Sequence, residues 1–140
     1  MKLSSIYLVM LLLISSCDLD QVTIKYQTYS EAEAENFFDK GWIPRSLIFE
    51  SMSDIYLRSN IDLNTCIFSY QVDRDDLIVL ESRIEPSKAE FAGVRRIKIP
   101  KEWLTKVEEL NDCYFVPSSN TDTVLIKIDK STCDVIGWID

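Results

Sequence analysis

Apolar and polar residues alternate in several short runs of the chain, and this pattern is typical of strands that are buried on one face. The clearest run is residues 65–72, in which Cys66, Phe68, Tyr70 and Val72 fall on one face. We predict further strands at residues 22–29, 91–99, 113–116, 123–128 and 133–139.

Apolar residues at helical spacing predict helices between these strands, at residues 30–40, 53–60, 73–85 and 100–110. Either Ser51 or Ser53 can cap the second of them, and a strand at residues 77–80 is the alternative to part of the third. In the first of them, Ser30 and Glu33 form a capping box. Gly41 is placed to end that helix in the left-handed conformation. Strands and helices are mixed along the chain, and the last strands are in hairpin order. We therefore expect one small α+β domain, an antiparallel sheet with helices packed on one face.

The first residues have the pattern of an export signal. Lys2 precedes the apolar run Ile6–Ile14, which has nine residues, whereas a helix that spans a membrane needs about twenty. The run ends in Ile14-Ser15-Ser16-Cys17, which resembles the lipobox of bacterial lipoproteins. Such a signal implies cleavage between Ser16 and Cys17 and acylation of the new terminal cysteine. The alternatives are a conventional cleaved signal and a buried first helix of a cytosolic protein.

The lipobox divides the chain into a signal peptide at 1–16, a tether at 17–21 and an α+β globular domain at 22–140. Two or three acyl chains on Cys17, palmitate among them, would hold the protein stably at a membrane. We expect it to be anchored in the bacterial cell envelope and to face the periplasm or the cell exterior. Asp18 resembles the retention signal of inner-membrane lipoproteins in enterobacteria.

Composition excludes much of catalysis. The 140 residues carry a formal net charge of -8 and no histidine, so histidine-based nucleophile pairs, proton shuttles and metal ligands are absent. Removal of residues 1–16 takes away Lys2 and leaves a net charge of -9. This charge opposes binding to nucleic acid and favours a basic protein partner. An acidic surface that only confers solubility is the structural alternative.

Three blocks with characteristic spacing carry a resemblance to a known family, namely Gly41-Trp42-Ile43-Pro44, Ser53-Asp54-Ile55 and Asn60-Ile61-Asp62-Leu63-Asn64. Over residues 26–72 the chain resembles the YbbD head-domain family of small bacterial lipoproteins. That family has no established activity, so the resemblance implies a compact exported lipoprotein and supplies no catalytic residue. The chain departs from the family pattern at Arg45, where an acidic residue is common.

The Gly-Trp-Ile-Pro block has a structural interpretation and a functional one. Glycine frees the backbone to leave the helix, Trp42 buries a large surface, and Pro44 fixes the following extended segment. The alternative is an interaction surface centred on Trp42 and Arg45.

Three cysteines remain beyond the lipobox, and an exported protein lies where disulfides persist. A four-residue loop at 129–132 would set Ile128 opposite Cys133, close to the strand that carries Cys113. We predict a bridge between Cys113 and Cys133, and a pairing of Cys66 with Cys133 stays open. No Cys-x-x-Cys pair is present, so neither a zinc site nor a redox motif is expected.

Two charged clusters have simpler structural explanations. The acidic residues at 73–76 are better placed to cap a helix than to bind calcium, because the glycine and distal glutamate of a calcium loop are missing. The basic residues at 95–101 alternate with isoleucines, which indicates the solvated face of a strand, although lipid head groups are an alternative contact. We expect neither a metal nor another cofactor.

These observations favour a noncatalytic, membrane-anchored lipoprotein that binds another protein of the cell envelope. A sharper hypothesis of the same class is an immunity or exclusion lipoprotein that neutralises a basic toxin or phage factor. The third hypothesis is a hydrolase that uses carboxylates alone, which requires two facing carboxylates in a cleft.

Overall fold

The computed structural model describes residues 21–61, 64–87, 112–116 and 124–139. The predicted signal peptide, the tether and Cys17 lie outside these residues. So do the strand predicted at 91–99, the helix predicted at 100–110 and the basic residues at 95–101.

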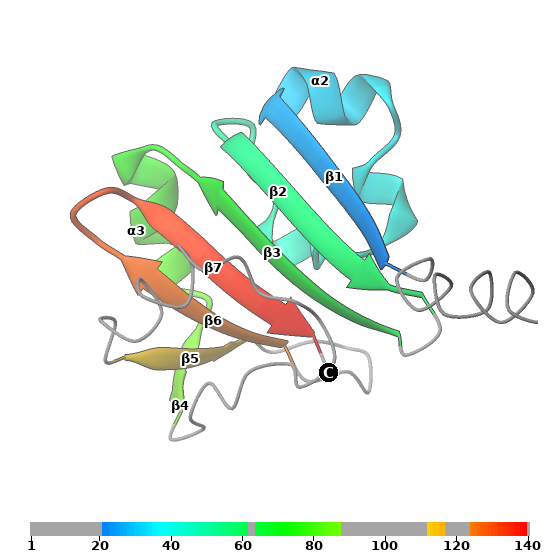
Figure 1. Cartoon of the computed structure of the whole chain (residues 1–140). Coiled ribbons are helices and arrows are strands. Elements are labelled where there is room, and N and C mark those ends of the chain that lie inside the picture. The colour runs from blue at the N-terminus through cyan, green and yellow to red at the C-terminus, as the bar shows by residue number, and fades with distance from the viewer. Residues whose placement is uncertain (1–20, 62–63, 88–111, 117–123, 140) are drawn as a thin grey trace, which may run out of the picture.

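The described residues form a small domain that is mostly sheet, with two α-helices (Figure 1). Seven antiparallel strands lie in the order β1-β2-β3-β7-β6-β5-β4. Their bounds are Gln21–Thr28 (β1), Ser53–Asn60 (β2), Thr65–Gln71 (β3), Glu85–Ser87 (β4), Cys113–Val116 (β5), Val124–Asp129 (β6) and Asp134–Ile139 (β7). The strands predicted at 22–29, 65–72, 113–116, 123–128 and 133–139 are therefore confirmed to within one residue.

The helix predicted at 53–60 is wrong, because this segment is strand β2 between β1 and β3. Ile55 and Leu57 alternate with the half-buried Tyr56 and Arg58, which is the period of a strand. Seven residue pairs join β2 to β1 on one side. Pairing on both sides satisfies the backbone of β2, so tertiary structure decides this segment against its local helical signal.

The first helix is shorter than predicted and begins earlier. Helix α2 covers Tyr29–Ala34, and its N-cap is Thr28, not Ser30, because the Thr28 hydroxyl accepts a hydrogen bond from the Glu31 N–H. Asn36 then takes a positive φ of 53° and breaks the helix. A separate 3-10 turn, η1, follows at Phe38–Lys40 and ends at Gly41, whose φ is 76°.

Helix α3 covers Arg74–Glu81 and confirms the predicted acidic start. Asp73 is its N-cap, and the Asp73 carboxylate accepts a 2.8 Å hydrogen bond from the Asp76 N–H. The Ser51 hydroxyl donates to Asp76 at 2.6 Å and accepts from the Asp73 N–H at 3.1 Å. The acidic run therefore caps α3 and attaches it to the segment before β2.

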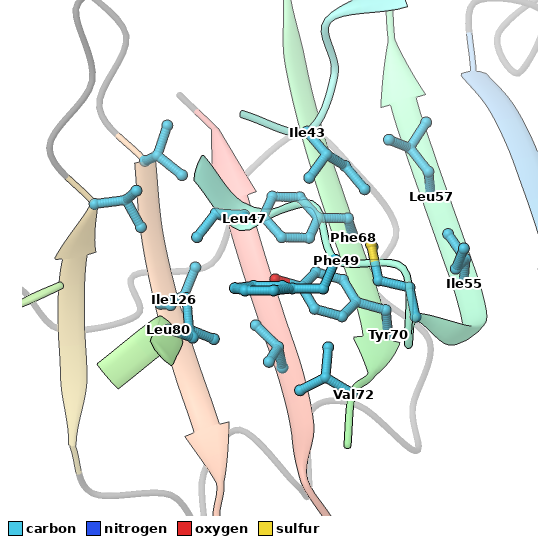
Figure 2. Packing of buried hydrophobic residues seen from close by; sticks show 14 of the residues in the cluster. Ile43, Leu47, Phe49, Ile55, Leu57, Phe68, Tyr70, Val72, Leu80 and Ile126 are labelled. Carbon is cyan, nitrogen blue, oxygen red and sulfur yellow. The ribbon is translucent and has the colours of Figure 1, made fainter. Parts of the chain in front are cut away.

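The main core lies on the sheet face that the helices cover. Phe68 and Tyr70 of β3 lie beneath Leu47 and Phe49, which come from the segment around the 3-10 turn η2 (Arg45–Leu47) (Figure 2). Leu80 of α3 belongs to the same cluster and packs near β6. The predicted apolar face of residues 65–72 is therefore confirmed as the centre of this core.

The cysteines do not pair as predicted. Cys66, Cys113 and Cys133 are free thiols in the structure. Cys113 packs with Trp138 in a second, smaller cluster, whereas Cys133 packs against the main core. Neighbouring residues of a strand point to opposite faces of the sheet. The second cluster lies on the face that the described helices leave uncovered, so Cys113 and Cys133 are on opposite faces.

The terminal hairpin also has a different register from the one predicted. Asp129 pairs with Asp134, so the turn consists of residues 130–133 and Cys133 lies in the turn rather than opposite Ile128. Cys133 has a φ of 57° there. The change of register moves Cys133 into the turn but leaves it with the main core, so the opposite sheet faces of Cys113 and Cys133 explain why the predicted bridge is absent.

Candidate functional site

A surface pocket of about 490 Å³ lies between helix α2 and the two 3-10 turns that follow it. Its walls combine aromatic, acidic and basic side chains with one amide, and they come from residues within twenty positions of each other in the chain. The lining residues are Tyr29, Glu33, Asn36, Phe38, Asp39, Arg45 and Ile48.

Two stacked aromatic rings form one wall of the pocket. The ring centroids of Tyr29 and Phe38 are 5.0 Å apart, and the ring planes differ by 19°. Phe38 in turn meets the buried Phe37 edge-on, at 5.2 Å between centroids. Because Phe37 is anchored in the core, the wall is held in place from beneath.

The Tyr29 hydroxyl donates a 2.8 Å hydrogen bond to Glu33 Oε1, one helical turn further along α2. This hydrogen bond, with burial and the negative charges of Glu33 and Glu50, raises the pKa of Tyr29 above its ordinary value of 10.0. Tyr29 therefore stays neutral near pH 7 and acts as a donor that orients the carboxylate. The second carboxylate oxygen of Glu33 stays available to a ligand.

Arg45 supplies the positive charge of the lining. Its guanidinium lies 3.6 Å from Asp39 Oδ1, and both side chains are largely exposed, at 89% and 73%. An exposed ion pair of this kind is worth little, with a median of about 0–1 kcal/mol, so a ligand can separate the two groups at small cost.

The pocket exists because the backbone turns twice. Asn36, at positive φ, ends α2 and turns the chain so that Phe37 enters the core while Phe38 is half-buried at its edge. Asparagine tolerates this conformation better than most residues. Pro44 then precedes η2, and this turn buries Leu47 while it leaves Arg45 and Ile48 on the pocket side.

The predicted interaction surface on Trp42 and Arg45 is divided in the structure. Arg45 lines the pocket. Trp42 is half-buried against the main core, and its carbonyl accepts a 3.6 Å hydrogen bond from the Cys66 thiol. Tyr29 and Glu33 were not predicted as site residues, although their spacing of four positions places them on one side of a helix.

Two other features that bear on function are groups of metal ligands and helices that could span a membrane. No three cysteine or carboxylate side chains within residues 21–61, 64–87, 112–116 and 124–139 lie close enough to hold a metal ion. In the same ranges no helix is long and apolar enough to cross a membrane.

All residues that line the pocket belong to a segment that matches a known family of domains. Residues 20–71 match the YbbD head domain. The matched YbbD segment contains β1, α2, both 3-10 turns, β2 and β3, and it confirms the resemblance over residues 26–72. Helix α3 and strands β4 to β7 lie beyond the YbbD match. Neither a curated protein nor a solved structure matches the chain.

Proposed function

We propose that this protein is a noncatalytic bacterial lipoprotein, anchored through acylated Cys17, whose head domain binds another protein of the cell envelope. The observation that carries the proposal is the position of the lipobox. The cysteine of Ile14-Ser15-Ser16-Cys17 stands only four residues before Gln21, the first residue of β1.

This spacing limits where the domain can lie. Four residues span at most about 14 Å when fully extended, so an acylated Cys17 would keep the Gln21 end of the sheet close to the bilayer. Strand β1 has eight residues and a length of about 24 Å. Helix α2, which carries Tyr29 and Glu33, begins at the opposite end of β1 (Figure 1). The pocket would therefore lie away from the anchored end, where a partner in the envelope can reach it.

The pocket is suited to protein recognition. It combines stacked aromatic rings with charged groups that are exposed and weakly paired, and aromatic and arginine side chains are enriched where proteins bind each other. The absence of histidine from the sequence also favours a binding role over acid-base chemistry near neutral pH.

The anchor is tested by metabolic labelling with a clickable fatty acid, in wild type and in Cys17→Ser. We expect label in the wild type only, because the thiol of Cys17 is the acceptor. Equal labelling of both proteins, or no labelling of either, contradicts the proposed anchor.

Partner binding is tested with a photocrosslinking amino acid at position 45 in the pocket or, as a control, at position 78. Ile78 lies on α3 outside the pocket and is 59% exposed. We expect a discrete crosslinked protein from position 45 of the anchored chain and none from position 78. Equal crosslinking from both positions, or none from position 45, contradicts binding at this face.

A further inference from the structure

We propose that the Tyr29 pocket binds an arginine side chain of the protein partner. This inference rests on the proposed function, since it specifies the chemistry by which the partner is recognised. The pocket is the cavity defined above, between α2 and the 3-10 turns.

The charges of the pocket favour a cation. Its lining contains the carboxylates of Glu33 and Asp39 and one positive group, Arg45. Arg45 pairs with Asp39 at 3.6 Å, whereas Glu33 is held by the neutral Tyr29 hydroxyl. Glu33 therefore adds a negative charge that no cation in the lining balances. Glu50 lies close enough to Tyr29 to act on it electrostatically and adds a further negative charge.

The aromatic wall favours a flat cation over a compact one. The stacked rings of Tyr29 and Phe38 present an apolar surface beside the Glu33 carboxylate. A guanidinium can lie along a ring and donate two parallel hydrogen bonds to a carboxylate, whereas an ammonium acts as a point charge. Arginine therefore satisfies both walls of the pocket at once.

The same chain already uses this contact elsewhere. The Arg83 guanidinium lies 5.3 Å from the ring centroid of Phe49, and it also donates a 3.0 Å hydrogen bond to the Ser46 carbonyl. An aromatic ring and an oxygen acceptor together hold this arginine. The pocket offers the same pair of features to a side chain from outside.

The inference is tested with two short peptides, acetylated and amidated Gly-Arg-Gly and the matched Gly-citrulline-Gly. Citrulline has nearly the shape of arginine but no charge. Saturation-transfer NMR on the full lipidated chain in nanodiscs measures weak binding of each peptide. For one side chain we expect a dissociation constant on the order of 1 mM for the arginine peptide. We expect binding of the citrulline peptide to be at least about tenfold weaker.

Two variants with the same change in charge locate the binding. Glu33→Gln keeps an acceptor for the Tyr29 hydroxyl but removes the charge, so we expect the arginine peptide to bind about tenfold more weakly. Asp75→Asn, on the exposed side of α3, should leave binding nearly unchanged. Phe38→Leu is a second pocket variant, which removes one of the two rings of the aromatic wall without a change in charge and should also weaken binding.

Equal binding of the two peptides overturns the inference, because it removes the role of the charge. Equal weakening by Glu33→Gln and Asp75→Asn also overturns it, because the attraction would then come from the overall charge of the domain. If the crosslink from position 45 forms but the arginine peptide does not bind, the proposed function stands and the arginine inference fails. If the peptide binds but no crosslink forms, partner binding at this face fails and the chemistry of the pocket stands.

Discussion

Gly137 lies in the middle of β7, and we expect the addition of a single methyl group there to lower the stability of the domain. It pairs with Phe68 across the β3–β7 ladder, and the Phe68 ring lies over it. A Cβ atom at position 137 would lie 2.5 Å from Phe68 Cε2 and 2.9 Å from Cε1, and closer still to Cζ. Gly137→Ala therefore requires the ring or the strand to move.

The ring has little room to move. Phe68 is fully buried and stacks on Tyr70, with ring centroids 6.1 Å apart and planes that differ by 6°. Overpacking of this kind typically costs about 1–3 kcal/mol. Alanine in place of a strand glycine returns about 0.5–1 kcal/mol. We expect Gly137→Ala to lower the free energy of unfolding by about 1–2 kcal/mol.

Urea unfolding of the full chain, followed by tryptophan fluorescence, measures this change. Phe68→Leu should relieve the crowding, so the double variant should lose less stability than the two single changes together. Gly41→Ala is the control, because a Cβ there meets no atom within 4 Å and its cost arises from the φ of 76°. The cost at Gly41 should add to that of Phe68→Leu. An unchanged stability in Gly137→Ala, or additivity with Phe68→Leu, would refute the packing argument.

Three further predictions concern buried and titrating groups. The buried Tyr70 hydroxyl has no hydrogen-bond partner within the part of the chain that the structure describes. Tyr70→Phe should therefore leave the urea midpoint unchanged or raise it. A decrease of more than about 1 kcal/mol in the free energy of unfolding would mean that the hydroxyl has a partner. A hydrogen bond from the Ser131 hydroxyl, with backbone N–H groups of the turn, lowers the pKa of Asp129 from 3.8 to about 2, against a smaller effect of burial. The folded pKa is therefore below the unfolded one, so the stabilisation by Asp129 is complete above about pH 4 and is lost as the pH falls toward 2. Acid unfolding of Asp129→Asn should lack this component, and an identical acid transition would contradict it. Burial raises the pKa of the Cys66 thiol to about 12. Iodoacetamide at pH 8 should therefore modify the half-buried Cys133 long before Cys66, as measured by mass spectrometry of the folded chain. Fast modification of Cys66 would contradict its burial.

Part of the fold could be predicted from sequence because its signals are local. Strand β3 has one apolar face over its whole length, and Asp73 has a side chain that satisfies the first N–H groups of α3. The family resemblance over residues 26–72 depends on the order and spacing of residues alone. These features need no information about distant parts of the chain.

The sequence predicted the candidate site only in part, because Arg45 is the one residue of the pocket lining that a sequence motif pointed to. Arg45 follows the Gly-Trp-Ile-Pro block, from which the sequence predicts an interaction surface on Trp42 and Arg45. Tyr29 and Phe38 gave no such signal, because two aromatic residues nine positions apart become a stacked wall only after Asn36 breaks the helix between them.

The sequence by itself determined the strand that centres the core, the cap of α3 and the lipobox that motivates the proposed anchor. The tertiary structure alone decided that residues 53–60 form a strand, that Cys113 and Cys133 face different clusters, and that Tyr29, Glu33 and Arg45 share one pocket. The physical reason is that a short segment whose sequence is compatible with both helix and strand adopts the structure that its hydrogen-bonded neighbours in the fold impose. The hydrogen bonds of β1 and β3 to β2 outweigh local preference, and the pairing of β5 with β6 directs Cys113 to the second cluster, away from Cys133.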